Sequence, residues 1–95
     1  MKNIRIGYGY DMHKLTSGTY IILGGIKIDS DYSIIAHSDG DILLHTLSDA
    51  IYGSLAKGDI GTHFPSDKTN LNISSLEIIQ HACGLLKDSN YKINN

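Results

Sequence analysis

Apolar side chains recur at every second position near the start of the chain, at Ile4, Ile6, Tyr8 and Tyr10. Glycines occupy two of the positions between them. This period of two predicts a strand over residues 3–10 with one covered face. The glycines would leave its other face open to a second backbone or to a ligand.

Two isoleucine-rich runs, 20–23 and 26–28, are separated only by Gly24-Gly25. Because a pair of glycines suits a tight two-residue turn, the pattern predicts a β-hairpin. The next stretch, residues 29–33, is polar and is expected to form a loop.

The strongest helical pattern covers residues 39–56. Ser38 is a suitable N-cap, Asp41 resembles the second half of a capping box, and Lys57-Gly58 marks a helix end. The apolar side of this helix comprises Leu43, Leu47, Ala50, Ser54 and Leu55, and the polar side comprises Asp41, His45, Ser48, Asp49 and Tyr52. We expect the apolar side to pack and the polar side to face polar surroundings.

A second helix is predicted from its N-cap Ser74, with Glu77 as the capping partner, to about Asp88. The helical spacing predicts burial of Ile79, Ala82, Cys83 and Leu86. Residues 91–93 then begin an extended, strand-like run. Because this run is short for a parallel strand, we expect residues 1–95 to be a single, incomplete domain that ends by truncation.

The composition is that of one globular domain. Of the 95 residues, 41% are hydrophobic and 19% are charged, which does not suit a disordered chain or a coiled coil. A net charge of −2 and a single arginine, Arg5, provide no basic surface for nucleic acid. No apolar run approaches the ~18 residues that cross a bilayer, so we expect a cytoplasmic protein without a membrane partner. The single cysteine, Cys83, is expected in the core.

Three residues form a candidate metal site. Asp11 and His13 lie two residues apart after the predicted strand, so their side chains would leave the same face. His45, on the polar side of the first helix, would meet them if that helix packs over the strand end. Two histidines and one carboxylate are typical of catalytic zinc, but non-haem iron uses the same ligand types. The spacing leaves both metals open, and ordinary surface roles as well.

Two further motifs could bind a small anionic ligand. His37-Ser38 directly precedes the first helix, where free backbone N–H groups attract phosphate, although Ser38 could equally be a plain N-cap. Asp59, in the sequence Asp-Ile-Gly, could hold a pair of ribose hydroxyls or stabilise a turn.

Taken together, three ordered motifs resemble one known family. They are RIGYGYDMH at residues 5–13, AHSDGD at residues 36–41 with His45 four residues further on, and GDIGTHFP at residues 58–65. With the Leu23-Gly24-Gly25 turn, they closely resemble the 2-C-methyl-D-erythritol 2,4-cyclodiphosphate synthases over essentially the whole chain. The resemblance implies an α/β (α+β) fold with a β-sheet packed on helices, and a homotrimer with active sites between subunits.

The resemblance also implies a reaction in non-mevalonate isoprenoid biosynthesis. The family cyclises 4-diphosphocytidyl-2-C-methyl-D-erythritol 2-phosphate to the 2,4-cyclodiphosphate and releases CMP, which makes it a phosphorus-oxygen lyase. By resemblance, Asp11, His13 and His45 hold Zn²⁺, and His37 is the catalytic residue that orients and stabilises the phosphates with Ser38. The residues implied to bind substrate are Asp11, His13, His37, Ser38, Asp59, Ile60, Gly61, Phe64 and Asp67. The sequence leaves open whether Ser66 or Asp67 makes the last of these contacts.

Family members continue beyond the length of this chain, through further strands and a segment that binds a second divalent cation, Mg²⁺ or Mn²⁺. Two alternatives therefore accompany the synthase hypothesis. The chain could be an inactive remnant that keeps metal or phosphate affinity, or an unrelated iron oxygenase. Oxygenases of that type have all-β scaffolds, and the two predicted helices argue against this class.

Overall fold

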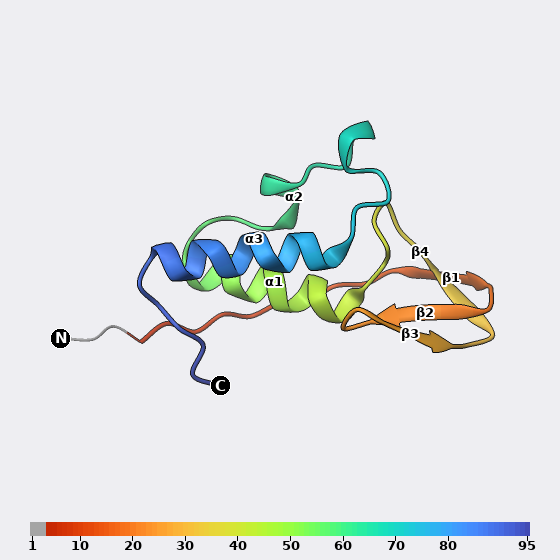
Figure 1. The fold of residues 1–95 in the computed structure, drawn as a ribbon, viewed down its shortest axis with the longest axis horizontal. Coiled ribbons are helices and arrows are strands. Elements are labelled where there is room, and N and C mark those ends of the chain that lie inside the picture. Colours follow the sequence, from red (N-terminus) through yellow and green to blue (C-terminus); the bar gives the residue numbers. More distant parts are fainter. Residues whose placement is uncertain (1–3) are drawn as a thin grey trace.

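Short strands occupy one end of the molecule, and two long helices lie side by side next to them (Figure 1). The computed structural model describes residues 4–95. The elements are β1 (Lys14–Ser17), β2 (Tyr20–Leu23), β3 (Ile26–Asp29), β4 (Tyr32–Ile35), α1 (Ile42–Ser54), α2 (Ile60–His63), the 3₁₀ helix η1 (Lys68–Asn70) and α3 (Ser75–Asp88). This is the α+β class expected from the sequence. None of these helices is long and apolar enough to cross a membrane.

The strand predicted over residues 3–10 is wrong for residues 4–10, which form no strand, and Asn3 lies outside the described residues. The segment runs alongside α1 instead (Figure 1). Its glycines face the helix, since a Cβ atom added to Gly9 would lie 1.9 Å from the carbonyl oxygen of Thr46. The open glycine face was predicted correctly, but within residues 4–95 no strand lies beside this segment to complete a ladder.

The four strands form one antiparallel ribbon that folds back on itself. Gly24 and Gly25 form the predicted hairpin turn between β2 and β3, and both have positive φ angles, 62° and 78°. Backbone hydrogen bonds from Gly18 to Asp31 and from Ser30 to Thr19 continue the ribbon into the β1–β4 pair. The loop predicted over residues 29–33 is therefore wrong at both ends, because Asp29 is the last residue of β3 and Tyr32 begins β4. Its partner β1 is distant in sequence, so no local pattern indicated the pairing.

Helix α1 begins later than predicted, and Ser38 is not its N-cap. The N-cap is Asp41, whose carboxylate accepts a hydrogen bond from the backbone N–H of Leu44 (3.0 Å). The same carboxylate accepts bonds from the backbone N–H groups of Gly24 (2.9 Å) and Gly25 (2.6 Å). Gly40 has a φ of 74°, which ends any helical path before Asp41. One buried carboxylate thus joins the hairpin turn to α1.

The packing sides of α1 differ from the prediction, although Leu55 is buried as expected. Its buried residues are His45, Ser48, Ile51 and Tyr52. Leu43 and Leu47, predicted to pack, are 55% and 42% exposed. The reason is α3, which lies along the polar side of α1 and covers it (Figure 1). The small core there consists of Ile51, Tyr52, Leu55 and Ala82.

Helix α3 starts at the predicted N-cap, Ser74, whose hydroxyl accepts a hydrogen bond from the N–H of Leu76 (3.3 Å). Ala82 is buried as expected, but Cys83 is exposed and the prediction of a core cysteine is wrong. Only one narrow stripe of α3 faces α1, and the next residue along the helix points about 100° away from that stripe. Residues 91–93 form no strand.

Candidate metal centre and adjoining pocket

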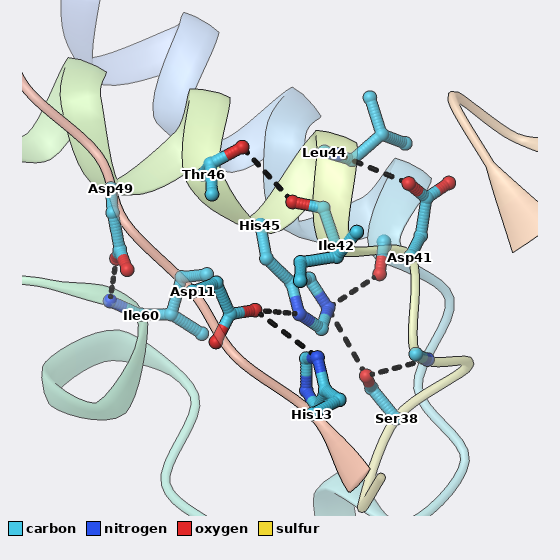
Figure 2. Close-up of polar contacts among 12 residues, drawn as sticks. Asp11, His13, Ser38, Asp41, Ile42, Leu44, His45, Thr46, Asp49 and Ile60 are labelled. Carbon is cyan, nitrogen blue, oxygen red and sulfur yellow. Dashed lines mark hydrogen bonds and ion pairs between the residues drawn. The ribbon is translucent and has the colours of Figure 1, made fainter. Parts of the chain in front are cut away.

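Asp11, His13 and His45 lie together, and each offers a ligand atom within 4.8 Å of the others. The Oδ2 atom of Asp11 is 3.0 Å from Nδ1 of His45 and 3.5 Å from Nδ1 of His13 (Figure 2). His45 comes from the first turns of α1 and is buried, whereas the other two come from the segment that runs along this helix. The sequence predicted that these three residues could meet.

The glycine contacts explain how the segment reaches His45. The Cβ atom of an alanine at position 7 would lie 1.9 Å from the carbonyl oxygen of Ala50, and Gly9 contacts Thr46 equally closely. Backbone therefore lies directly on backbone over two turns of α1. This contact sets the position of Asp11 and His13, which follow immediately.

The donor set fits a divalent transition metal. The Nδ1 atom of His13 is buried and has no hydrogen-bond partner within residues 4–95, although it faces Asp11 and His45. A buried ring nitrogen without a partner is costly, and a metal ion between the three side chains would satisfy it. Two imidazole nitrogens and one carboxylate oxygen suit zinc and iron alike.

A hydrogen-bonded network lies behind His45, on the side away from Asp11. The Nε2 atom of His45 is 2.7 Å from the hydroxyl oxygen of Ser75 and 3.1 Å from that of Ser38. The hydroxyl of Ser75 donates in turn to the carboxylate of Asp39, which also accepts from the backbone N–H of Ser75 (2.8 Å). Burial alone would raise the pKa of Asp39, but these bonds and one from the N–H of Asp41 outweigh it and lower that pKa.

Asp49 lies one turn beyond His45 on α1. Its carboxylate accepts a hydrogen bond from the backbone N–H of Ile60 (2.9 Å), which holds the start of α2 against α1 (Figure 2). Burial is the main cause that raises the pKa of Asp49, and the negative charges of Asp59 and Asp11 add to it.

A pocket of about 200 Å³ adjoins the three candidate ligands. Its lining includes seven of the residues singled out in the sequence: His13, His37, Ser38, His45, Ile60, Phe64 and Ser66. His37 is anchored there, because its Nε2 atom is 2.7 Å from the carbonyl oxygen of Asp67 and its own carbonyl accepts a bond from Asn72 (2.8 Å). The pocket thus combines two of the candidate metal ligands, His13 and His45, with the predicted phosphate residues.

The remaining predicted site residues lie outside this lining. The carboxylate of Asp59 caps α2 by accepting from the N–H of Thr62 (2.9 Å), and bonds from the backbone and hydroxyl of Thr62 lower its pKa. Asp67 caps η1 in the same way. Gly61 is exposed, and Ser66 rather than Asp67 lines the pocket. Their roles toward a substrate stay predictions.

Sequence reasoning missed Asp39 and Ser75. Both were assigned to helices, yet their side chains meet beside His45 across 36 residues of sequence. A serine next to a predicted N-cap gives no local signal of such a contact.

Comparison with known proteins decides the family. The YgbB family profile matches residues 4–95. The chain belongs to the YgbB family. A relative from Geotalea daltonii, named 2-C-methyl-D-erythritol 2,4-cyclodiphosphate synthase, is 47% identical over 97% of this chain and 54% of its own length. A relative of the same name from Pseudomonas putida is 46% identical over 97% of this chain and 59% of its own length.

Solved structures agree with this YgbB assignment. A structure of 2C-methyl-D-erythritol-2,4-cyclodiphosphate synthase has a TM-score of 0.83 and 39% identity, covering 90% of this chain and 58% of the other. A Plasmodium falciparum IspF complex with CDP has a TM-score of 0.78 and 39% identity, covering 96% of this chain and 55% of the other. The resemblance and the fold predicted from the motifs are confirmed. This chain spans a little over half the length of these YgbB relatives.

Proposed function

We propose that this chain provides the metal centre and phosphate pocket of a 2-C-methyl-D-erythritol 2,4-cyclodiphosphate synthase. The substrate is 4-diphosphocytidyl-2-C-methyl-D-erythritol 2-phosphate. An oxygen of its 2-phosphate attacks the phosphorus atom that is bonded to the erythritol 4-oxygen in the diphosphate. The new P–O–P bond closes the ring, and the bond to CMP breaks, so that CMP leaves with the electron pair.

The proposal rests on one observation: the candidate metal site opens directly into the pocket. Asp11, His13 and His45 converge around a buried, unpartnered nitrogen, and the pocket that begins at His13 and His45 continues to His37 and Ser38. Phosphoryl transfer depends mainly on positioning and on stabilisation of phosphate charge. A cation site that opens into a pocket with hydroxyl and imidazole groups meets both needs.

Asp11, His13 and His45 would hold Zn²⁺. When bound, this ion supplies positive charge to a phosphate oxygen. His37 would be the catalytic residue: its Nε2–H donates to the carbonyl oxygen of Asp67, since a carbonyl can only accept, and its Nδ1 would donate to a phosphate oxygen when the ring carries both protons. The hydroxyl of Ser38 would orient the same phosphates.

The other substrate contacts are assigned to the loop and short helix after α1. Ile60 and Phe64 line the pocket, while Asp59, Gly61 and Asp67 would contact the sugar part beyond its edge. The pocket volume of about 200 Å³ is below the ~300–1,000 Å³ of complete ligand sites. It would therefore hold the phosphates, with the second divalent cation and the cytidine bound by residues of a longer chain or of neighbouring subunits in a homotrimer.

CMP release tests the proposal. The chain is fused to the C-terminal remainder of the Geotalea daltonii relative, loaded with Zn²⁺ and Mg²⁺, and mixed with the cytidylyl substrate. We expect the fusion to release CMP and its His45→Ala variant to release at least 100-fold less. A folded, zinc-loaded fusion that releases no CMP would favour the alternative, a remnant that binds metal or phosphate without catalysis.

A further inference from the structure

We propose that Asp39 and Ser75 are positioning residues that keep a proton on Nε2 of His45 and thereby reserve Nδ1 for a metal ion. The consequence for zinc rests on the proposed function, whereas the hydrogen-bond arrangement belongs to the chain itself.

Asp39 sets the direction of the first hydrogen bond in this network. Its carboxylate lies beside three donors: the backbone N–H of Ser75 (2.8 Å), the backbone N–H of Asp41 (3.1 Å) and the hydroxyl of Ser75. An ionised carboxylate can only accept hydrogen bonds. The hydroxyl proton of Ser75 is therefore directed at Asp39.

The next hydrogen bond in the network joins Ser75 to His45. With its own proton committed to Asp39, the hydroxyl oxygen of Ser75 can only accept from Nε2 of His45, 2.7 Å away. Nε2 consequently carries a proton, and Nδ1, 3.0 Å from Oδ2 of Asp11, is the nitrogen that can bind a metal. Any proton between Nδ1 and Asp11 is displaced when a metal binds, because binding releases protons from the ligands.

Ser75 is the essential link in this chain of bonds. Its side chain is fully buried, with a relative exposure of 0%, and it is the first residue of α3. Ser38 also lies near Nε2 of His45, at 3.1 Å, and accepts from the N–H of Gly40. Among the described residues no carboxylate accepts from the hydroxyl of Ser38, so its proton can turn either way. The docking of α3 against α1 thus orients a candidate metal ligand.

Ser75→Ala is the direct variant, and Ser48→Ala is its matched control. Both serines are fully buried, but the hydroxyl of Ser48 has no hydrogen-bond partner within residues 4–95. Zinc affinity of the 95-residue chain is measured by competition with a chromophoric chelator. We expect Ser75→Ala to weaken zinc binding roughly 10–100-fold and Ser48→Ala to change it less than about two-fold. Zinc binding of Ser75→Ala as tight as that of the unaltered chain would overturn the proposal.

A second variant covers the case in which Ser75→Ala does not fold. The amide of Asp39→Asn can donate as well as accept, so it allows the hydroxyl of Ser75 to turn toward His45 and favours a proton on Nδ1 instead. Long-range ¹H–¹⁵N spectra of the metal-free chain report which ring nitrogen is protonated. Because the carboxylate of Asp11 also faces Nδ1, the decisive readout is Nε2: we expect a protonated Nε2 in the unaltered chain and loss of that proton in Asp39→Asn.

The spectra also separate this proposal from the proposed function. If the unaltered chain binds no zinc, or if His13→Ala keeps it, the metal centre is wrong while the spectra still decide the role of Ser75. An unprotonated Nε2 in the unaltered chain would overturn the positioning role whatever the zinc result.

Discussion

Ser48 and His13 each have a buried polar atom without a hydrogen-bond partner within residues 4–95. The two atoms differ in their surroundings. Nδ1 of His13 faces Asp11 and His45, where a metal could satisfy it, whereas the hydroxyl of Ser48 lies on the buried side of α1. A buried hydroxyl with no partner lowers stability.

We therefore expect Ser48→Ala to leave the free energy of unfolding unchanged or to raise it by about 1 kcal/mol. Urea denaturation followed by circular dichroism measures the change. A loss of more than about 1 kcal/mol would mean that the Ser48 hydroxyl makes a stabilising contact in solution.

The burial of Tyr52 predicts a loss of folding stability at high pH. It is fully buried, and burial, with smaller contributions from the charges of Asp49 and Cys83, raises its pKa to about 12 from its ordinary value of 10.0. Between these two values the unfolded chain ionises Tyr52 and the folded chain does not. Stability is thus full below pH 10 and is lost as the pH rises toward 12.

The measurement is a spectrophotometric tyrosine titration with parallel urea denaturation. We expect a component near pH 12 that Tyr52→Phe removes, together with the part of the stability loss that it causes. Tyr8, 80% exposed, provides the control: Tyr8→Phe should leave the late component in place. The assignment would fail if the late component persisted in Tyr52→Phe.

At the scale of elements, Asp41 joins the hairpin turn to α1. Its buried carboxylate accepts from Leu44 at the helix start and from both turn glycines. Asp41→Ala removes the cap and leaves buried N–H groups unpaired, so we expect a loss of about 3 kcal/mol in the free energy of unfolding. Asp31→Ala, at an exposed aspartate, should change it by less than about 0.5 kcal/mol. Equal effects of the two variants in urea denaturation would contradict the joining role.

Gly9 and Gly84 differ in how closely other atoms approach them. An added Cβ at Gly9 would lie 1.9 Å from a carbonyl oxygen of α1, whereas one at Gly84 meets nothing within 4 Å. We expect Gly9→Ala to separate the segment from α1 and to weaken zinc binding more than 10-fold, because Asp11 and His13 follow it. Gly84→Ala, in the exposed middle of α3, should stabilise the chain by about 0.5–1 kcal/mol. Unchanged zinc affinity in Gly9→Ala would refute the importance of the close contact.

The elements that the sequence predicted well have local signals. The Gly24-Gly25 turn needs two positive φ angles, and Ser74 caps α3 within one turn. Strand β4 and the buried side of α1 depend on partners distant in sequence, which local periodicity cannot show. The same division holds at the candidate site. The Asp11–His13 spacing was visible in the sequence, but the contact of Asp39 with Ser75 requires the docked helices.

At the scale of the whole molecule, the described chain exposes much apolar surface. Its radius of gyration is 14.3 Å, compared with roughly 12 Å for a compact domain of this length. One stripe is continuous along the segment beside α1, where the exposed residues are Ile4 (91%), Ile6 (88%), Tyr8 (80%), Tyr10 (67%) and Met12 (75%). Exposed apolar stripes of this kind promote association.

We expect the 95-residue chain to self-associate at micromolar concentration, as measured by light scattering. Replacing Ile6 and Tyr8 together by lysine should lower the apparent mass. The matched control replaces Ile26 and Leu71 together by lysine. These two side chains are 66% and 56% exposed and lie outside the stripe. If both double variants lower the mass equally, the stripe is not the site of association.

Helices α1 and α3 run in the same direction, so both begin at the end of the molecule near the strands (Figure 1). Each helix macrodipole places about half a positive charge at its start, and parallel neighbours bring these like charges together. Asp41 caps the first helix, and Asp39 accepts from the first N–H of the second. These two carboxylates offset both macrodipoles and occupy N–H groups that could otherwise hold an anion. A phosphate in the adjoining pocket would therefore be attracted by a bound cation and by side-chain donors such as Ser38, with little help from the helix starts.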